Sequence, residues 1–537
     1  MSIPVAINVF GNKSIEPWRQ IYRFYGTDEI NYVYMKDGRK LLEKLGSLGP
    51  HQAWFRAHSQ FVTGEGVHAL KWGSTNAYTE DKDGNPVYDW TIIDRVYDTY
   101  LEKKLKPYVQ FGFMPQALSV HPEPYQHKWT PTAPYGEIFT GWAYPPKDYA
   151  KWGELIYQWT KHCVERYGIS ECESWYWETW NEPDIGYWQG TPEEYNKLYD
   201  YAVEGVRRAL PSAKVGGPET TGRGPEYLRG FLQHCLDGEN QATQGKGAPL
   251  DFVSFHAKGA PKYQEETKSV RMGIAHHLRE IDTSFGVIAS FPKFKPLPIV
   301  LGESDPEGAA AAQGPQLAYR NSTLYSSYTA ASFARKHLLS EKHGVNLEGV
   351  VTWAFEFEDQ PYFAGFRVLA SNDVDLPVLN IFRMFARMEG ERLASTSSQQ
   401  VPLQDLLQNS VREDADVGAI AARDGQTVSV MVWHYHDDDL KGPSAAVDLT
   451  LEGVGWKENS TLRHYRVDET HSNSYTVWKS MGSPQQPTAE QYAKLQAAGS
   501  LAEYTGPTKL EAQSGVPKLS FDLPRQGVSL LVFENVG

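Results

Sequence analysis

Residues 174–184 read SWYWETWNEPD, an aromatic run followed by polar residues around a proline. The first part, 174–181, predicts a buried β-strand, because short apolar runs that end in polar punctuation are typical of strands. Asn181, Glu182 and Asp184 follow directly. The stretch therefore predicts a strand that presents polar side chains at its carboxyl end.

Similar strand segments recur along the chain and alternate with helical patterns. Working outward, we predict further strands at 5–11, 51–58, 106–113, 213–219, 251–257, 296–303 and 349–357. Apolar residues at helical spacing predict helices at 38–48, 149–168, 191–211, 269–281 and 325–343. Eight strands that alternate with helices favour an α/β fold of the (β/α)8 (TIM) barrel type. A doubly wound open sheet is the alternative, but the glycine-rich first turn that it needs is missing.

The pattern changes after about residue 395. Segments with period-two alternation, bounded by Gly, Asp and Pro, predict an antiparallel β-sandwich. We therefore expect a catalytic barrel at 1–390 and a β-sandwich accessory domain at 391–537. The sandwich is expected to be a structural partner of the barrel, with a separate glycan-binding module as the alternative.

Composition narrows the functional class. The chain has 52 Lys and Arg against 66 Asp and Glu, a net charge of −14, which argues against nucleic acid as a partner. There is no run of 18 apolar residues, so no membrane-spanning helix is expected. Three cysteines exclude a disulfide framework. The 16 Trp and 31 Tyr favour carbohydrate, because sugar rings stack on aromatic planes.

The first twenty residues lack a basic segment followed by a long apolar stretch, so they do not read as a signal peptide. We expect a cytoplasmic location for the chain as given, or a secreted or periplasmic one where a signal peptide has been removed. A homo-oligomer is possible.

The active site of a barrel lies at the carboxyl ends of its strands. The polar residues there are Arg56, His58, Asn181, Glu182, Asp184, Glu219, His256, Lys258, Glu303, Asp305, Glu356, Glu358 and Asp359. Glu182 and Glu303 are 121 residues apart but would meet across the barrel mouth. Either alone is more simply a helix cap or an arginine partner. Together they predict the carboxylate pair of glycoside hydrolysis, in which one acid is protonated and the other is ionised.

The motifs resemble glycoside hydrolase family 39, a family of retaining barrel enzymes that includes β-xylosidases and α-L-iduronidases. The matching stretches are WFRAH (54–58), GFMPQAL (112–118), WYWETWNEPD (175–184), KVGGPET (214–220), LDFVSFHAKGA (250–260) and PIVLGESDP (298–306). The resemblance implies that Glu182 is the general acid/base and Glu303 the nucleophile. It also implies that Asn181 binds the sugar 2-hydroxyl, that Arg56 and His58 line the first sugar subsite, and that His256 is a subsite histidine on the sixth strand.

Three further residues are candidates for substrate binding. Trp188, in the loop after the acid, could stack on a sugar or pack in the core. Trp353 lies in the eighth predicted strand, and Arg367 follows it and could face an anion. Retention predicts carboxyl groups about 5–5.5 Å apart. No metal or organic cofactor is needed.

The sugar is less well defined by the sequence. The segment FHAKGA is similar to the iduronidase branch, where a lysine at the place of Lys258 helps to hold the substrate carboxylate. Lys258 could equally donate to neutral hydroxyls or be a solvated loop lysine. Asp28 and Glu29 could shape the pocket, but we favour a helix cap. We expect an exo-acting β-xylosidase on plant-type glycans; an α-L-iduronidase-like uronidase, an arabinosidase and a β-galactosidase are the alternatives.

Two other functional classes fit the sequence less well. A non-catalytic carbohydrate-binding protein would have lost one of the carboxylates, and both are present. A metal-dependent aldolase or isomerase would need a ligand cluster, for which His58, Glu219 and His256 are the candidate set.

Overall fold

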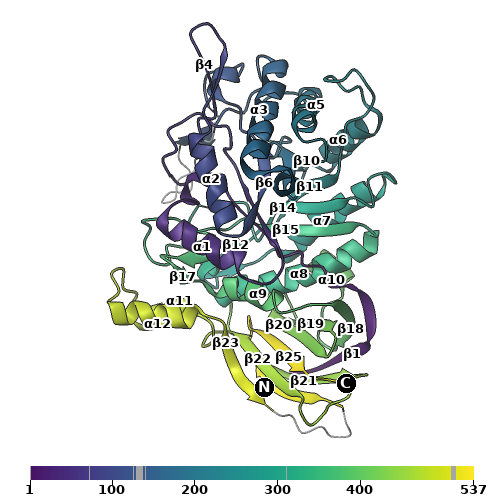
Figure 1. The fold of residues 1–537 in the computed structure, drawn as a ribbon. Coiled ribbons are helices and arrows are strands. Elements are labelled where there is room, and N and C mark those ends of the chain that lie inside the picture. Colours follow the sequence, from purple (N-terminus) through teal and green to yellow (C-terminus); the bar gives the residue numbers. More distant parts are fainter. Residues whose placement is uncertain are drawn as a thin grey trace.

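The computed structural model describes residues 2–71, 73–124, 126–128, 137–139, 141–309, 311–508 and 516–537. The chain forms a barrel surrounded by helices and a large sheet beneath it (Figure 1). Among the described residues, no helix has both the length and the apolar character needed to cross a bilayer.

The predicted barrel is confirmed. Eight parallel strands close on themselves: β2 (Phe24–Thr27), β3 (Ala53–Ala57), β6 (Leu105–Phe111), β9 (Tyr176–Thr179), β10 (Lys214–Thr220), β11 (Phe252–Lys258), β14 (Pro298–Asp305) and β15 (Asn346–Thr352). Seven of these overlap predicted strand segments.

Helices pack around the barrel: α1 (Lys36–Gly46), α2 (Thr91–Glu102), α3 (Tyr149–Tyr167), α5 (Pro192–Ala209), α6 (Pro225–Asp237), α7 (Ile274–Ala289), α8 (Thr323–His343) and α9 (Pro377–Phe385). The start of α5 follows from its sequence. The Thr191 side chain accepts a hydrogen bond from the Glu194 backbone N–H, and the Glu194 carboxylate accepts one from the Thr191 N–H.

The predicted first strand, 5–11, is wrong as a barrel strand. It lies in β1 (Ile3–Pro17), which pairs with β18 (Glu391–Ser397) and β21 (Ala445–Glu452) in the other sheet. Its alternating burial suits a sheet with one solvated face, whereas β2 is buried at every position. The division between residues 390 and 391 stays a prediction. β1 precedes this division in sequence but belongs to the sheet whose other strands follow it.

The second sheet has nine strands in the order β23-β22-β25-β20-β19-β18-β1-β21-β24. Its remaining members are β19 (Asp416–Asp424), β20 (Thr427–Tyr435), β22 (Thr461–Val467), β23 (Ala502–Thr508), β24 (Lys518–Leu523) and β25 (Val528–Glu534). His464 on β22 and Phe521 on β24 have ring centroids 5.1 Å apart, although six strands separate them in the order. The sheet therefore folds over on itself as the predicted sandwich, but the parallel pairing of β1 with β21 makes it mixed and not wholly antiparallel as expected.

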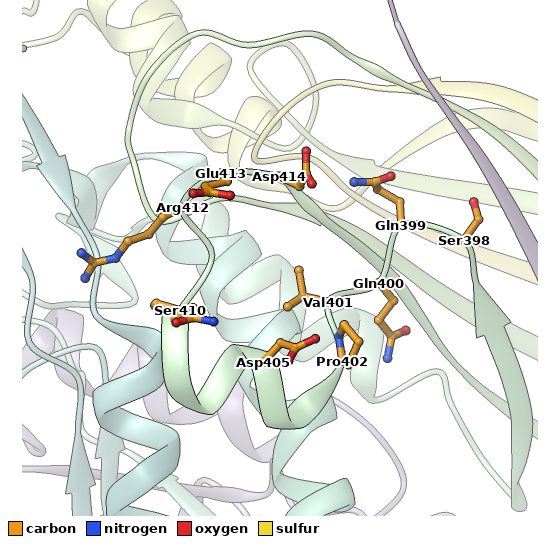
Figure 2. Close-up of a pocket in the computed structure, with 11 residues that line it drawn as sticks. Ser398, Gln399, Gln400, Val401, Pro402, Asp405, Ser410, Arg412, Glu413 and Asp414 are labelled. Carbon is orange, nitrogen blue, oxygen red and sulfur yellow. The ribbon is translucent and has the colours of Figure 1, made fainter.

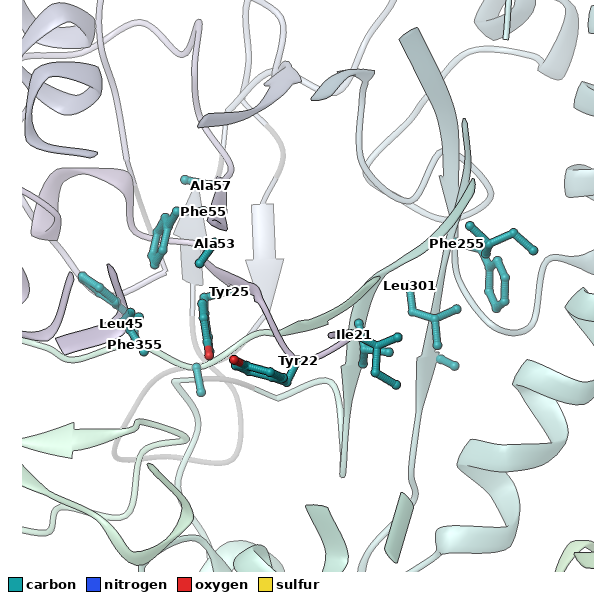
Figure 3. Packing of buried hydrophobic residues seen from close by; sticks show 14 of the residues in the cluster. Ile21, Tyr22, Tyr25, Leu45, Ala53, Phe55, Ala57, Phe255, Leu301 and Phe355 are labelled. Carbon is teal, nitrogen blue, oxygen red and sulfur yellow. The ribbon is translucent and has the colours of Figure 1, made fainter. Parts of the chain in front are cut away.

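Alternating side chains divide the barrel wall into two faces. On β3, Trp54 belongs to an inner cluster with Phe24, Tyr108, Tyr176 and Phe252, which fills the barrel floor. Ala53, Phe55 and Ala57 belong to the outer core, which Figure 3 shows together with Leu45 of α1. Because strand side chains alternate, Arg56 and His58, which lie two and four positions after Trp54, also point inward and form the layers above this floor.

A polar groove of about 720 Å³ lies where the barrel meets the sheet (Figure 2). Its lining comes from the segment after β18, from α10 (Leu403–Asn409) and from the loop after it, and includes Gln399, Asp405 and Arg412. None of the predicted site residues lines this groove.

Candidate active site

The carboxyl ends of the strands bring the two predicted catalytic carboxylates together. One oxygen of Glu182, one oxygen of Glu303 and a ring nitrogen of His256 all lie within 4.8 Å of one another. A retaining glycosidase needs its carboxyl groups about 5–5.5 Å apart, and an inverting one about 6.5–9.5 Å. The spacing therefore suits a carboxylate that attacks the sugar directly.

β-Bulges turn two carboxylates into the barrel. On β14, Leu301 pairs with Phe255 and Glu303 pairs with His256, so Gly302 is the extra residue. Val300 faces the inner cluster and Leu301 the outer core, so regular alternation would direct Glu303 outward. On β10, Glu219 is the extra residue in the same way, with φ 55°.

Two cations and a histidine surround the predicted nucleophile. Glu303 Oε2 lies 2.7 Å from the Lys258 Nζ, and its Oε1 lies 3.2 Å from His58 Nε2 and 3.7 Å from an Arg56 guanidinium nitrogen. Burial by itself would raise the pKa of Glu303, but Lys258, His256 and His58 hold that pKa well below its ordinary value. Glu303 is therefore ionised, as a nucleophile must be.

His256 links the acid to the layer below. Its Nδ1 lies 2.9 Å from Glu182 Oε1, and its Nε2 lies 2.8 Å from Glu219 Oε2. Burial opposes its charge, but Glu303, Glu219 and Glu182 raise the pKa of His256 to about 10. With a proton on each nitrogen, the ring donates toward one oxygen of Glu182 and leaves the other oxygen free of this hydrogen bond.

A fully buried layer supports these groups from below. Arg56 Nε donates to Glu178 Oε2 over 2.7 Å, and an Arg56 Nη2 donates to Asn181 Oδ1 over 3.1 Å. Burial raises the pKa of Glu178 well above its ordinary value. Despite its own burial, Glu219 has a pKa lowered to about 2 by Arg56, Glu178 and His256. Glu178 thus holds a proton while Glu219 balances the two cations.

Lys258 and Arg367 have different positions relative to the nucleophile. Lys258 contacts Glu303 and Asp305 directly, the latter over 2.9 Å. Arg367 is buried one layer behind, where it donates to the Trp353 carbonyl over 3.0 Å and lies 3.6 Å from Asp305. Trp353 places its ring 4.5 Å from that of His58, so it forms the wall behind this histidine.

Trp188 lies in an aromatic cluster behind the loop that follows Glu182. Its ring is buried, packs 5.2 Å from Trp180, and donates its indole N–H to the Thr191 carbonyl. The sequence left open whether Trp188 stacks on a sugar or packs in the core, and in the structure it packs in the core.

The expected helix cap at Asp28 and Glu29 is wrong. Neither side chain caps the short helix η1 (Ile30–Tyr32) that follows. Asp28 Oδ1 lies 3.3 Å from His58 Nε2, and its other oxygen accepts from the Lys71 ammonium. Glu29 accepts from the Lys71 backbone N–H over 2.8 Å. Sequence reasoning missed Lys71 because it lies in a loop, while Asp28 carried a signal: it directly follows β2.

Among the described residues, two groups have the residue types that hold metal ions: Asp28, His58 and Glu303, and Glu182, His256 and Glu303. In each, protein cations already neutralise the carboxylates, because Lys71 pairs with Asp28 and Lys258 with Glu303. The expectation that the site needs no metal stays a prediction.

Comparisons with known proteins agree with this geometry. The family model described as glycosyl hydrolases family 39 matches residues 58–511. A β-xylosidase of Geobacillus stearothermophilus is 26% identical over 491 residues, which cover 89% of this chain and 86% of that protein. An α-L-iduronidase of Mus musculus is 26% identical over 375 residues, 64% of this chain and 56% of that protein.

Solved structures share the fold. A monomeric β-xylosidase from Caulobacter crescentus CB15 superposes with a TM-score of 0.73 at 21% identity and covers 98% of this chain and 99% of its own. A bacterial orthologue of human α-L-iduronidase superposes with a TM-score of 0.77 at 19% identity, over 99% of this chain and 84% of its own.

Proposed function

Because the chain belongs to glycosyl hydrolase family 39 and is a glycoside hydrolase, we propose that it is a retaining exo-glycosidase of the β-xylosidase type. The observation that carries this proposal is the pair Glu182 and Glu303, with one oxygen of each within 4.8 Å. The β-xylosidase relative covers more of this chain than the iduronidase relative does, which favours a pentoside.

The proposed reaction has two displacements. In the first, a Glu303 oxygen attacks the anomeric carbon, the bond from that carbon to the aglycone oxygen breaks, and the Glu182 proton passes to the leaving oxygen. In the second, Glu182 takes a proton from water, the water oxygen attacks the same carbon, and Glu303 leaves as a carboxylate. His256 keeps Glu182 oriented in both steps.

An α-L-uronide is the second candidate, and Lys258 favours it. Its ammonium reaches the pocket at Glu303 and stays charged, because Asp305 and Glu303 raise its pKa against the effect of burial. A uronate carboxylate could approach that ammonium. The charge is shared between two protein carboxylates, however, which leaves less of it for a third anion.

A panel of 4-nitrophenyl glycosides tests both candidates: β-D-xyloside, α-L-arabinofuranoside, β-D-galactoside, β-D-glucoside and α-L-iduronide. We expect xyloside turnover that falls by about 10⁴-fold or more in Glu303→Ala. Azide should restore turnover in this variant and give a glycosyl azide of inverted configuration, because azide then attacks from the vacated nucleophile side. Turnover that survives in Glu303→Ala would contradict the mechanism. Turnover of the iduronide in place of the xyloside would make the uronide, and not the pentoside, the substrate.

A further inference from the structure

The side of the nucleophile opposite Lys258 holds a second lysine–aspartate pair. On one side, Lys258 contacts both Glu303 and Asp305. On the other, Lys71 contacts Asp28, and His58 joins that pair to Glu303. Asp28 and Lys71 are both nearly inaccessible to solvent, so this pair belongs to the interior of the site.

His58 lies between two carboxylates. Its Nε2 is 3.3 Å from Asp28 Oδ1 and 3.2 Å from Glu303 Oε1, and an oxygen of each acid lies within 4.8 Å of the other. Burial lowers the pKa of His58, so the ring is neutral and carries one proton. A proton on Nε2 can be shared by both acids, whereas a bare Nε2 would face two anions with its lone pair.

Gln110 determines which nitrogen holds that proton. As placed, its amide oxygen lies 3.0 Å from His58 Nδ1, where it would accept a proton held on that nitrogen. With the amide oxygen toward Nδ1, the amide NH₂ group is buried without a hydrogen-bond partner among the described residues. Turning the amide by half a turn places the NH₂ group at Nδ1, where it donates to the ring. In that orientation Nδ1 accepts, and the ring proton is on Nε2.

Lys71 keeps Asp28 ionised. Burial would raise the pKa of Asp28, but Lys71 and His58 lower it below its ordinary value. The Lys71 backbone is in turn held by Glu29. The result is a fixed negative charge close to the nucleophile, with one shared hydrogen between them.

We propose that Asp28 is a positioning residue, which shares the Nε2 hydrogen of His58 with Glu303 and takes it over when Glu303 becomes the sugar ester. The inference rests on the proposed retaining mechanism. When Glu303 forms its bond to the sugar, its negative charge disappears and its hydrogen bond from His58 weakens. Asp28 then holds the ring in place, and the repulsion between the two anions ends. Asp28 therefore favours formation of the ester more than its hydrolysis.

Kinetics of Asp28→Asn test this asymmetry, on whichever glycoside the wild type cleaves. kcat/KM reports ester formation, and kcat on the 2,4-dinitrophenyl glycoside reports ester hydrolysis, because this aglycone leaves rapidly. We expect kcat/KM to fall about 10–100-fold, the range typical of lost supporting contacts. The kcat on the dinitrophenyl glycoside should change less than about threefold. An equal fall in both, or no fall in kcat/KM, overturns the proposal.

A matched control is Glu80→Gln. Glu80 also accepts from two lysines, Lys147 and Lys151, each over 2.9 Å, but it contacts none of the site residues named above. Its loss should leave both kinetic parameters unchanged.

A second measurement does not depend on turnover. In ¹⁵N-histidine-labelled wild-type protein, with His58→Asn to assign the signal, we expect His58 to be neutral with its proton on Nε2. A proton on Nδ1, or on both nitrogens, overturns the proposal. If the wild type cleaves no glycoside, the proposed function fails, and this spectrum still decides the role of His58 and Asp28.

Discussion

At the scale of single residues, the site depends on how charge is shared among buried groups. Arg56, His256 and Lys258 supply three positive charges, and Glu219, Glu303 and Asp305 are among the carboxylates that they contact. A buried charge is stable only when it is paired. Removing one charged group therefore leaves its partner buried without compensation, at the full desolvation cost.

His256 gives this balance a pH dependence. Its pKa rises from an ordinary 6.5 to about 10 in the folded protein, because Glu303, Glu219 and Glu182 outweigh burial. A raised folded-state pKa stabilises the fold fully below pH 6.5, and this stabilisation disappears as the pH rises through about 10. We expect the wild type to lose a few kcal/mol over that interval in urea unfolding, and His256→Asn to lose less. Parallel stability curves for the two proteins would contradict this assignment.

At the scale of the element, the bulge at Gly302 places Glu303 in the barrel. A Cβ at Gly302 would lie 2.0 Å from a Glu219 oxygen, closer than any real contact. Gly302→Ala must therefore push Glu219 or open the bulge. We expect it to cost about 1–3 kcal/mol of stability, as overpacking does. Activity should fall by about 100-fold, because a misplaced nucleophile attacks poorly.

Gly230→Ala in α6 is the control for that glycine. Its Cβ would meet no atom within 4 Å, so alanine in this helix should stabilise the protein by about 0.5–1 kcal/mol. Normal activity and stability in Gly302→Ala, measured beside this control, would show that the bulge does not position Glu303.

The sequence predicted the strand ends but not the direction of the side chains. Seven barrel strands, the polar residues that end them, and the Glu182–Glu303 pairing could all be read from local patterns. Strict alternation from Val300 and Leu301 would have turned Glu303 outward, since no local pattern revealed the bulge. The strand FYGT escaped detection because four residues carry too little periodicity. Because that strand is not predicted, the sequence pattern favours a helix cap for Asp28, which directly follows it.

At the scale of the whole molecule, one face of the second sheet shares a core with the barrel, and the other face packs into a core of its own that includes Ile7. A single hydrophobic cluster contains barrel and helix residues together with Met431, Trp433 and Leu530 of the sheet. Arg335 of α8 also forms a fully buried ion pair with Asp416 of β19 over 2.7 Å. In Figure 1, both chain ends lie in the second sheet, where β1 runs beside the later strands. Strands of the second sheet therefore come both before and after the barrel in the sequence.

This arrangement predicts that damage to β1 destabilises the barrel. Ile7 is fully buried in the sheet core, while Ile15 on the same strand is 47% exposed. We expect Ile7→Ala to cost about 2–5 kcal/mol, the usual range for a buried isoleucine, and Ile15→Ala less than about 0.5 kcal/mol. Heat inactivation reports the barrel, and far-ultraviolet circular dichroism reports the whole fold. Because the two parts share a core, both midpoints should fall together in Ile7→Ala. An unchanged inactivation midpoint beside a lowered dichroism midpoint would mean that the sheet unfolds independently, and that the shared core does not couple them.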